Sequence, residues 1–427
     1  MQTFSFHRRV WFKRFQSKIS PVQGRKKRPR KDHGHHRRPY GGNAVRSKKE
    51  IIASLLFETF GYGSIAVTSY LPIYFERTGA SRFEIGILMA TSPFAMIISA
   101  PLLGRAADSV SSRPRMLFFM GLLAALFSCT LYTNPGFVPN LLITFAMFSF
   151  IMSSIPIGES MMLKSSSIGE NRFSNVRMMG TIGYAAISLL TGYLLARSIS
   201  FLFVLLLITT ISTAISGLNL PNARIEENVI EKSFMRIILK NPILRAFLIL
   251  SFFLMMTMGY HFSFFPLYAN HVFQDERILG YLILTQTLAE IPVLLLFPFL
   301  RKRFSMRTLG AIIASGFIIR WFLTVFLFAG PAAFFIQLLH GLGVVPLSLL
   351  SMMEINRTIP AQMISRSQTF YWSVQSTGQI IGSVVGGAVV QASSLKTGYL
   401  FAGFVSIIGL MAFILAAFVF SRNVKGV

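Results

Sequence analysis

Twelve apolar stretches of about 20 residues each dominate this chain, separated by charged residues, Pro, Gly or Asn. A helix of that length crosses the hydrocarbon core of a bilayer, where the backbone must satisfy its own hydrogen bonds. The sequence therefore predicts an all-α membrane protein with twelve transmembrane helices. The predicted spans are residues 51–75, 84–104, 115–133, 139–162, 175–196, 199–219, 243–270, 278–299, 307–328, 332–356, 367–392 and 397–420.

Composition supports this assignment and narrows the function. Of the 427 residues, 53% are hydrophobic and 13% are charged, whereas soluble domains contain about 25% charged residues. Cys129 is the single cysteine and lies in an apolar stretch, so an internal disulfide is excluded and a thiolate metal site is not expected. The sequence contains no P-loop, metal-ligand spacing or catalytic triad. We therefore expect neither an enzyme nor a cofactor.

The N-terminal tail, residues 1–50, is strongly basic. It holds 16 of the 41 Lys and Arg residues and two acids, Asp32 and Glu50. Because Pro, Gly and charge dominate from residue 20 onward, we predict a disordered cytoplasmic tail that contacts anionic lipid. The aromatic residues between Phe4 and Phe15 leave an interfacial helix or a transit-like segment as alternatives. Nucleic-acid binding is not expected.

The remaining basic residues set an orientation. With the N-terminus inside, 19 Lys and Arg residues fall on the cytoplasmic side and 5 on the other, a clear positive-inside bias. An even number of spans then places both termini in the cytoplasm. A polar linker, residues 220–242, separates predicted six-helix halves at 51–219 and 243–420, and residues 421–427 form a short tail.

The two halves repeat each other at an offset of 194 residues. Leu71-Pro72-Ile73-Tyr74 ends the first span, and Phe265-Pro266-Leu267-Tyr268 occupies the same place in the seventh. Gly86 and Gly280 open the second and eighth spans at the same offset. Two six-helix pseudo-repeat bundles are a transporter architecture, whose solute site lies between the halves near the middle of the membrane.

The loop between spans two and three carries Gly104, Asp108 and Arg113. This spacing resembles the major facilitator superfamily, whose loop at this place has Gly, then Asp four residues on, then basic residues. The resemblance implies a loop that switches with conformation. Gly104 is expected to let two helices approach closely, and Asp108 to cap a helix or pair with an Arg. The family's basic residue directly after Asp is Ser109 here.

Three ionisable residues lie deep within successive spans of the second half: Glu290, Arg320 and His340. A charge at the centre of a bilayer costs about 2.5–3.5 kcal/mol on insertion scales, so these side chains should face one another rather than lipid. We expect Arg320 to keep Glu290 ionised until a proton arrives, and His340 to relay that proton or donate to solute. A purely structural network is the alternative.

The first half carries its own set of polar candidates. Glu159 near the inner end of span four and Arg177 at the start of span five are joined by a short loop and should meet. Glu58, about two turns into span one, is either an interfacial acid or a cavity acid. Trp372 in span eleven is a candidate for stacking on a solute ring, with ordinary packing as the alternative.

The order of these residues resembles the lactose permease and phenylpropionate permease branch of the superfamily. There an acid in helix four and an Arg in helix five bind sugar, which implies that role for Glu159 and Arg177. A Glu in helix eight, an Arg in helix nine and a His in helix ten couple solute to proton. Glu290, Arg320 and His340 fall in those helices, but Gly343 replaces the proton-carrying Glu one turn after the His.

The resemblance implies a proton-coupled symporter that imports a small organic solute by alternating access, with an aromatic or organic acid as one solute class. We expect it to work as a monomer in a bacterial-type inner membrane. A proton-independent facilitator or exporter is the alternative on the same fold. A non-transporting membrane receptor or membrane enzyme is the alternative of another class.

Overall fold

The computed structural model describes residues 40–222, 241–360 and 363–419. The chain divides into two compact units, residues 1–44 and 45–427, and the second contains nearly all of the described residues. Most of the predicted basic tail and of the linker 220–242, and all of the tail 421–427, lie outside the described residues. The lipid contact predicted for the N-terminal tail therefore stays a prediction.

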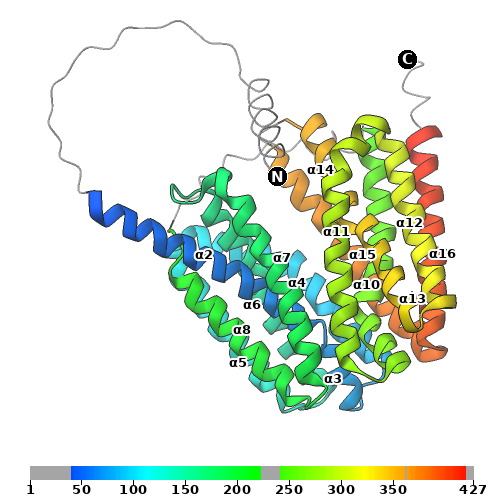
Figure 1. Cartoon of the computed structure of the whole chain (residues 1–427), viewed down its shortest axis with the longest axis horizontal. Helices are drawn as coiled ribbons and strands as arrows, with labels where there is room; N and C mark the ends of the chain where they lie inside the picture. The colour runs from blue at the N-terminus through cyan, green and yellow to red at the C-terminus, as the bar shows by residue number, and fades with distance from the viewer. Residues whose placement is uncertain (1–39, 223–240, 361–362, 420–427) are drawn as a thin grey trace, which may run out of the picture. The chain divides into compact units, whose positions relative to one another are not determined.

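The described residues are almost entirely helical and contain no strand (Figure 1). In chain order the longer helices are α2 (Tyr40–Thr68), α3 (Leu71–Arg77), α4 (Arg82–Ser109), α5 (Arg113–Tyr132), α6 (Phe137–Leu163), α7 (Gly169–Leu195), α8 (Ser200–Leu218), α10 (Pro242–Phe273), α11 (Glu276–Arg303), α12 (Met306–Leu327), α13 (Gly330–Leu338), α14 (Val344–Thr358), α15 (Ile364–Ala392) and α16 (Leu395–Ile414).

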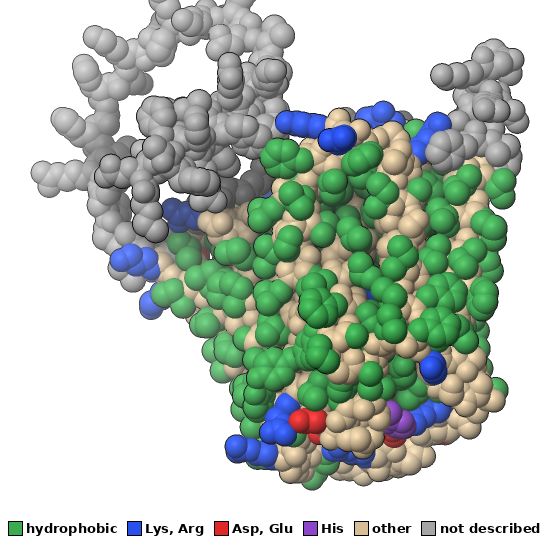
Figure 2. Space-filling model, turned by 45° about the vertical axis from the view of Figure 1, so that its right-hand side comes forward, with side chains coloured by type: hydrophobic (Ala, Val, Ile, Leu, Met, Phe, Trp, Pro, Cys, Tyr) green, Lys and Arg blue, Asp and Glu red, His purple; other side chains and the backbone are tan. Residues whose placement is uncertain are grey.

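These helices confirm the predicted membrane fold. Within the described ranges, eleven helical segments are long and apolar enough to cross a membrane. The predicted span at 367–392 is helix α15, which is 29 residues long but carries many Ser, Thr and Gln residues, and it supplies the twelfth. Figure 2 shows hydrophobic side chains over the middle of one face, with charged side chains at both edges. That distribution suits a protein surrounded by lipid.

Short sequence signals set where helices begin and break. Ser81 and Glu84 form a reciprocal capping box at the start of α4, and Asp275 caps α11 through the Arg277 amide. The first span breaks between α2 and α3, just before Pro72. The predicted span 332–356 is also interrupted, because α13 ends in a 3₁₀ turn over Leu339–Leu342 before α14 begins.

Helix α15 packs closely on α10 through a stripe of glycines that includes Gly378 and Gly382. A Cβ placed on Gly378 would lie 2.4 Å from the Phe252 carbonyl oxygen, and one on Gly382 would lie 1.7 Å from that of Met256. No larger residue fits at these backbone contacts. The glycine stripe is therefore a helix-packing surface.

The repeated sequence elements make equivalent contacts in the two bundles. The Tyr74 hydroxyl donates to the Leu131 carbonyl oxygen at 2.7 Å, near the end of α5. The Tyr268 hydroxyl donates to the Thr324 carbonyl oxygen at 3.2 Å, near the end of α12. Each tyrosine thus fastens the first helix of its bundle to the third, as a pseudo-repeat requires.

The two bundles meet at one end, which we call the closed end: the end with the loops at 78–81 and 274–275. A Cβ on Gly86 of α4 would lie 2.5 Å from the Ser383 carbonyl oxygen of α15. An ion pair between Arg77 and Glu276, and a hydrogen-bond contact of 2.9 Å between His271 Nε2 and Glu76 Oε1, also join the bundles there. Close backbone approach and charge pairing together hold this end shut.

Of the two predictions for the loop between α4 and α5, the pairing of Asp108 with an Arg is found and the close helix approach at Gly104 is not. Asp108 pairs with Arg113, whose Nε also donates to the Ala107 carbonyl oxygen at 3.0 Å. Asp108 does not cap α5, since that cap is the Ser112 side chain. A Cβ on Gly104 would meet no described atom within 4 Å. The expectation that Gly104 permits close helix approach is therefore wrong in this conformation.

Candidate functional site

A cavity of about 440 Å³ lies between the two bundles. Helices α2, α4, α6 and α7 line it from the first bundle, and α10, α11, α14 and α15 line it from the second. Its polar and aromatic lining includes Tyr62, Arg177, Tyr184, Gln286, Glu290, His340, Trp372, Gln375 and Gln379. The size and the mixed lining suit a small organic molecule.

Arg320 of α12 sits behind the cavity wall and is 2% exposed. Its guanidinium reaches His340 Nδ1 at 2.9 Å, His261 Nε2 at 3.1 Å and Gln337 Oε1 at 2.9 Å. It also lies over the ring of Trp321, 4.7 Å from the centroid. Neutral acceptors and an aromatic face thus hold this buried cation, without a carboxylate in direct contact among the described residues.

These contacts assign the protonation of both histidines. A guanidinium only donates hydrogen bonds, so His340 Nδ1 and His261 Nε2 must both accept. The proton of His340 is then on Nε2, which lies 3.5 Å from Glu290 Oε1. The proton of His261 is on Nδ1, 3.1 Å from the Tyr399 hydroxyl. Each imidazole is therefore neutral, and His340 points its N–H at Glu290.

The predicted triad is found, with one change in its order. Glu290 contacts His340 rather than Arg320, so His340 stands between the acid and the guanidinium. The side chain of Glu290 is 24% exposed and lines the cavity. The sequence suggested that Arg320 contacts Glu290 directly, but no such contact is found. The His340 ring lies between the two groups and contacts both.

His261 of α10 is a member of this network that the sequence prediction missed. It is 2% exposed and lies at the same depth as Trp321, with ring centroids 5.1 Å apart. Gln286 joins by donating to Gln337 Oε1 at 2.8 Å. A histidine within an apolar span is the same signal that identified His340, and it would have found His261 as well.

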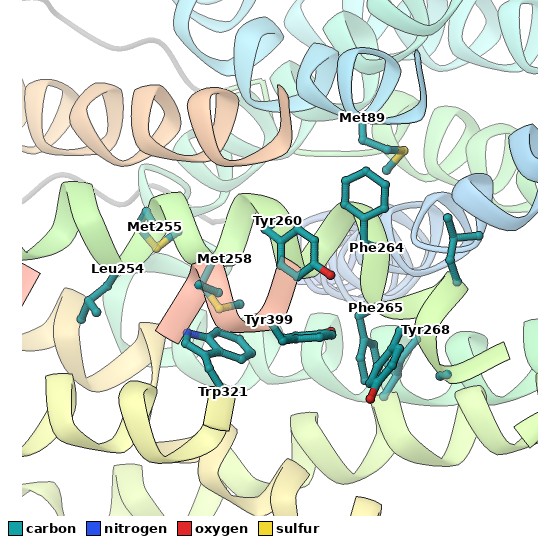
Figure 3. Packing of buried hydrophobic residues seen from close by; sticks show 14 of the residues in the cluster. Met89, Leu254, Met255, Met258, Tyr260, Phe264, Phe265, Tyr268, Trp321 and Tyr399 are labelled. Atoms are coloured by element: carbon teal, nitrogen blue, oxygen red, sulfur yellow. The ribbon is translucent and has the colours of Figure 1, made fainter. Parts of the chain in front are cut away.

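Packed aromatic rings support the network from behind. Figure 3 shows Trp321 and Tyr399 side by side near Tyr260. The Trp321 indole donates to the Thr257 hydroxyl at 3.1 Å, and the Tyr260 hydroxyl donates to the Leu395 carbonyl oxygen at 2.5 Å. Because each polar tip has a partner, these rings can be fully buried and hold His261 and Arg320 in place.

The break in span ten places His340 at the cavity. His340 lies in the 3₁₀ turn, and Gly343 ends that turn and precedes α14. A Cβ on the neighbouring Gly341 would lie 2.1 Å from the Ala289 carbonyl oxygen of α11. Because the α-helix is interrupted at His340, the residue one turn later is not stacked on the same helix face as His340. Gly343, which stands where the resemblance implies an acid, lies between the 3₁₀ turn and α14.

Glu159 and Arg177 meet across α6 and α7, as the short loop between their spans predicted. Arg177 Nε lies 3.1 Å from Glu159 Oε1, and the Tyr62 hydroxyl donates to the same oxygen at 3.2 Å. The guanidinium also covers the Tyr62 ring, 4.0 Å from its centroid. The Arg177 and Glu159 side chains are 37% and 23% exposed, and Arg177 and Tyr62 line the cavity.

The last two predicted residues take different positions. Glu58 of α2 is 1% exposed, which removes the interfacial alternative, but it does not line the cavity. Trp372 of α15 is 46% exposed and lines the cavity, as do Gln375 and Gln379 one and two turns further along the helix. Ordinary core packing thus does not account for Trp372.

Solved structures share this fold. The chain matches a crystal structure of the nucleoside transporter NupG with a TM-score of 0.73 at 17% identity, over 87% of this chain and 98% of that one. It matches a bacterial homolog of the human lysosomal transporter Spinster, solved inward-facing and unoccupied, with a TM-score of 0.69 at 12% identity, over 90% and 99%. These likenesses show the fold, which is a multi-pass membrane fold of two helical bundles around a polar cavity.

Sequence relatives agree with that class. Residues 52–401 match the MFS_1 like family, and the chain belongs to it. YegT of Escherichia coli (strain K12), which carries the name of a nucleoside transporter, is 27% identical over 79% of this chain and 83% of its own length. Maltose permease of Geobacillus stearothermophilus is 24% identical over 88% and 96%. These relatives are transporters rather than enzymes.

Proposed function

We propose that this transporter is a proton-coupled symporter that imports a neutral, ring-containing solute of the nucleoside class. The observation that carries the proposal is the chain of contacts Glu290–His340–Arg320 in the wall of a cavity that also presents Trp372 and side-chain amides. The acid supplies a site for a proton, and the cavity supplies stacking and hydrogen bonds for a solute.

The lining favours a flat, neutral molecule. Trp372 offers an exposed indole for stacking on a base. Gln379 of the same helix also lines the cavity and is half-buried. Its amide can both donate to and accept from the polar groups of a solute. The named nucleoside transporters among the relatives point the same way.

Two other solute classes compete with a nucleoside. The organic acid predicted from the resemblance to phenylpropionate permease needs a free cation, but among the described residues Arg177 is the one Lys or Arg that lines the cavity, and Glu159 already pairs with it. A sugar is favoured by the relation to maltose permease and by the resemblance of Glu159 and Arg177 to the lactose permease pair. Sugar hydroxyls suit the amides, whereas a planar base can also stack its π-system on the indole.

Proton coupling is supported by the position of Glu290. Among the described residues it is the carboxylate that lines the cavity, and the neutral His340 ring connects it to a fixed positive charge. Protonation of Glu290 removes its charge and so weakens it as the acceptor of the His340 N–H, and this change in turn affects the hydrogen bond between His340 and Arg320. A solute beside Glu290 and a proton on it then influence each other.

The remaining parts of the proposal follow from the sequence. Both termini lie in the cytoplasm of a bacterial-type inner membrane, so the closed end faces outward and the described conformation faces inward. The protein acts as a monomer, with the solute and the bilayer as partners and the proton as coupling ion in place of a cofactor. Neither nucleic acid nor a metal has a role in this mechanism.

Transport assays test the proposal. Purified protein is first screened for thermal stabilisation by uridine, maltose and 3-phenylpropionate, and uridine is expected to give the largest shift. In proteoliposomes, an inwardly directed proton gradient should then drive uridine accumulation, and an ionophore that collapses the gradient should abolish it. Uptake that is unchanged by the ionophore would establish a proton-independent facilitator instead. Stabilisation by 3-phenylpropionate alone would show that the solute is an organic acid and not a nucleoside.

A further inference from the structure

Glu58 is a buried acid whose charge no described residue satisfies. It lies on α2 and is 1% exposed, and neither of its carboxyl oxygens has a hydrogen-bond partner among the described residues. An ionised carboxylate in that state lacks both water and donors, which costs several kcal/mol, whereas the protonated form carries no net charge and costs far less. The surroundings therefore favour a neutral carboxylic acid.

The one cation near Glu58 among the described residues is Arg177, and it is already paired with Glu159. The titratable and charged side chains that face it are Tyr62 from its own helix, Glu159 from α6 and Arg177 from α7. Arg177 and the Tyr62 hydroxyl both bind Glu159. Two acids thus share one guanidinium, and in this conformation Glu159 holds it.

Glycine at position 180 keeps the second acid within reach of the guanidinium. A Cβ on Gly180 of α7 would lie 2.9 Å from Arg177 Nη1 and 3.0 Å from Glu58 Oε2. Both atoms therefore border the same small space, which the Tyr62 ring also borders, with its Cδ2 atom 2.6 Å from that Cβ. A modest rotation of the Arg177 side chain is enough to move its charge from Glu159 to Glu58.

We propose that Glu58 is a proton-binding site, occupied by a proton in this conformation, and that this proton selects the partner of Arg177. When the carboxyl O–H bond breaks and the proton passes to water, the new carboxylate competes with Glu159 for the guanidinium. Arg177 then leaves Glu159 and Tyr62, and the polar wall of the cavity changes. The inference rests on the proposed function for its role in transport, but not for the protonation itself.

The consequence is a coupling between proton and solute on the wall opposite Glu290. The arrangement with Glu58 protonated keeps Arg177 and Tyr62 at the cavity surface, where they are available to solute. A solute that binds this arrangement stabilises the protonated form of Glu58, and protonation strengthens solute binding by the same factor. Proton loss at Glu58 therefore favours solute release.

Infrared spectroscopy of the full chain in lipid vesicles at neutral pH tests the protonation without any solute. Wild type should show a C=O stretch of a protonated carboxyl that Glu58→Gln loses and Glu290→Gln keeps. Glu58→Asp should shift this band, which preserves the test if the Gln variant does not fold. A spectrum that is the same in wild type and both Glu58 variants would overturn the proposal.

Uridine binding tests the coupling. Raising the pH across the neutral range should weaken uridine binding to wild type about tenfold, whereas Glu58→Gln should lose much less affinity, because Glu290 is then the one proposed coupling acid that still titrates. An equal pH dependence in wild type and Glu58→Gln would overturn the coupling. If uridine does not bind wild type at all, the proposed solute is wrong, and the infrared comparison alone decides whether Glu58 carries a proton.

Discussion

The two walls of the cavity each contain an arginine, but they hold it in opposite ways. Arg320 is buried and makes its hydrogen bonds to two neutral histidines and an amide. Arg177 is partly exposed and pairs with a carboxylate, with a second acid beside it. The first arrangement fixes a charge, because every partner would have to move with it. The second lets a charge change partners.

This contrast indicates that the arginines of the two bundles have different functions. A guanidinium fixed behind His340 makes the proton state of Glu290 matter without moving itself. A guanidinium at the cavity surface is available to solute and responds to it. Variants of the two arginines should therefore differ in kind, one in the stability of the protein and the other in solute binding.

We expect the largest difference between the two walls when each arginine is replaced by methionine and the melting temperatures are compared. Arg320→Met leaves acceptors on His340, His261 and Gln337 with fewer donors, and hydrogen bonds to charged groups contribute about 1.5–3 kcal/mol each. We expect a loss of about 3 kcal/mol in unfolding free energy, visible as a lower melting temperature. Arg177→Met should melt close to wild type but bind uridine weakly. Equal melting temperatures for the two variants would contradict the contrast.

Two glycines sharpen the same comparison on a smaller scale. A Cβ on Gly341 meets the Ala289 backbone at 2.1 Å, whereas one on Gly180 meets side chains alone, the nearest being the Tyr62 ring at 2.6 Å. Backbone cannot yield, so Gly341→Ala should lower the unfolding free energy by about 1–3 kcal/mol, the usual cost of overpacking. Gly180→Ala should melt near wild type and change uridine affinity instead. Gly104→Ala, with open space around its Cβ, is the control that should be neutral.

The smallest expected effect lies outside the cavity, at the closed end. Hydrogen bonds from the Arg277 side chain and amide hold the pKa of Asp275 below its ordinary value. A lowered pKa in the folded protein stabilises it above the unfolded pKa, near 3.9, and this contribution is lost as the pH falls through the folded pKa.

Asp275→Asn keeps a side-chain oxygen for the helix cap but removes the charge. The melting temperatures of wild type and this variant should differ slightly at neutral pH and converge as the pH falls below 4. A difference that stays constant down to low pH would show that the charge of Asp275 contributes nothing to stability. This site tests ordinary surface electrostatics in a protein whose main effects lie in the cavity.

Much of the fold was predictable because bilayer physics leaves few choices. Span length, charge distribution and the repeat around Tyr74 and Tyr268 were enough to predict twelve helices in two bundles. Packing details were less accessible, since they depend on how each helix is rotated about its axis. Gly378 and Gly382 pack as their spacing indicates, but Gly104 does not.

The site was predictable as a set of residues but not as a set of contacts. The cost of a charge in lipid identified Arg320 and His340, and the short loop predicted that Glu159 meets Arg177. The apolar sequence around Gly343 did not predict that the helix of span ten is interrupted there. This interruption orients His340 toward Glu290. Which acid is left unpaired, Glu58, also depends on three helices at once.

The account depends most on Glu290 as the acid that links solute to proton. Proteoliposomes with wild type or Glu290→Gln are loaded with a pH-sensitive dye, and external uridine is added without an imposed gradient. Wild type should carry protons inward with uridine and acidify the interior, whereas Glu290→Gln should still exchange uridine across the membrane but acidify the interior much more slowly. Uridine-driven acidification by Glu290→Gln at the wild-type rate would contradict the account.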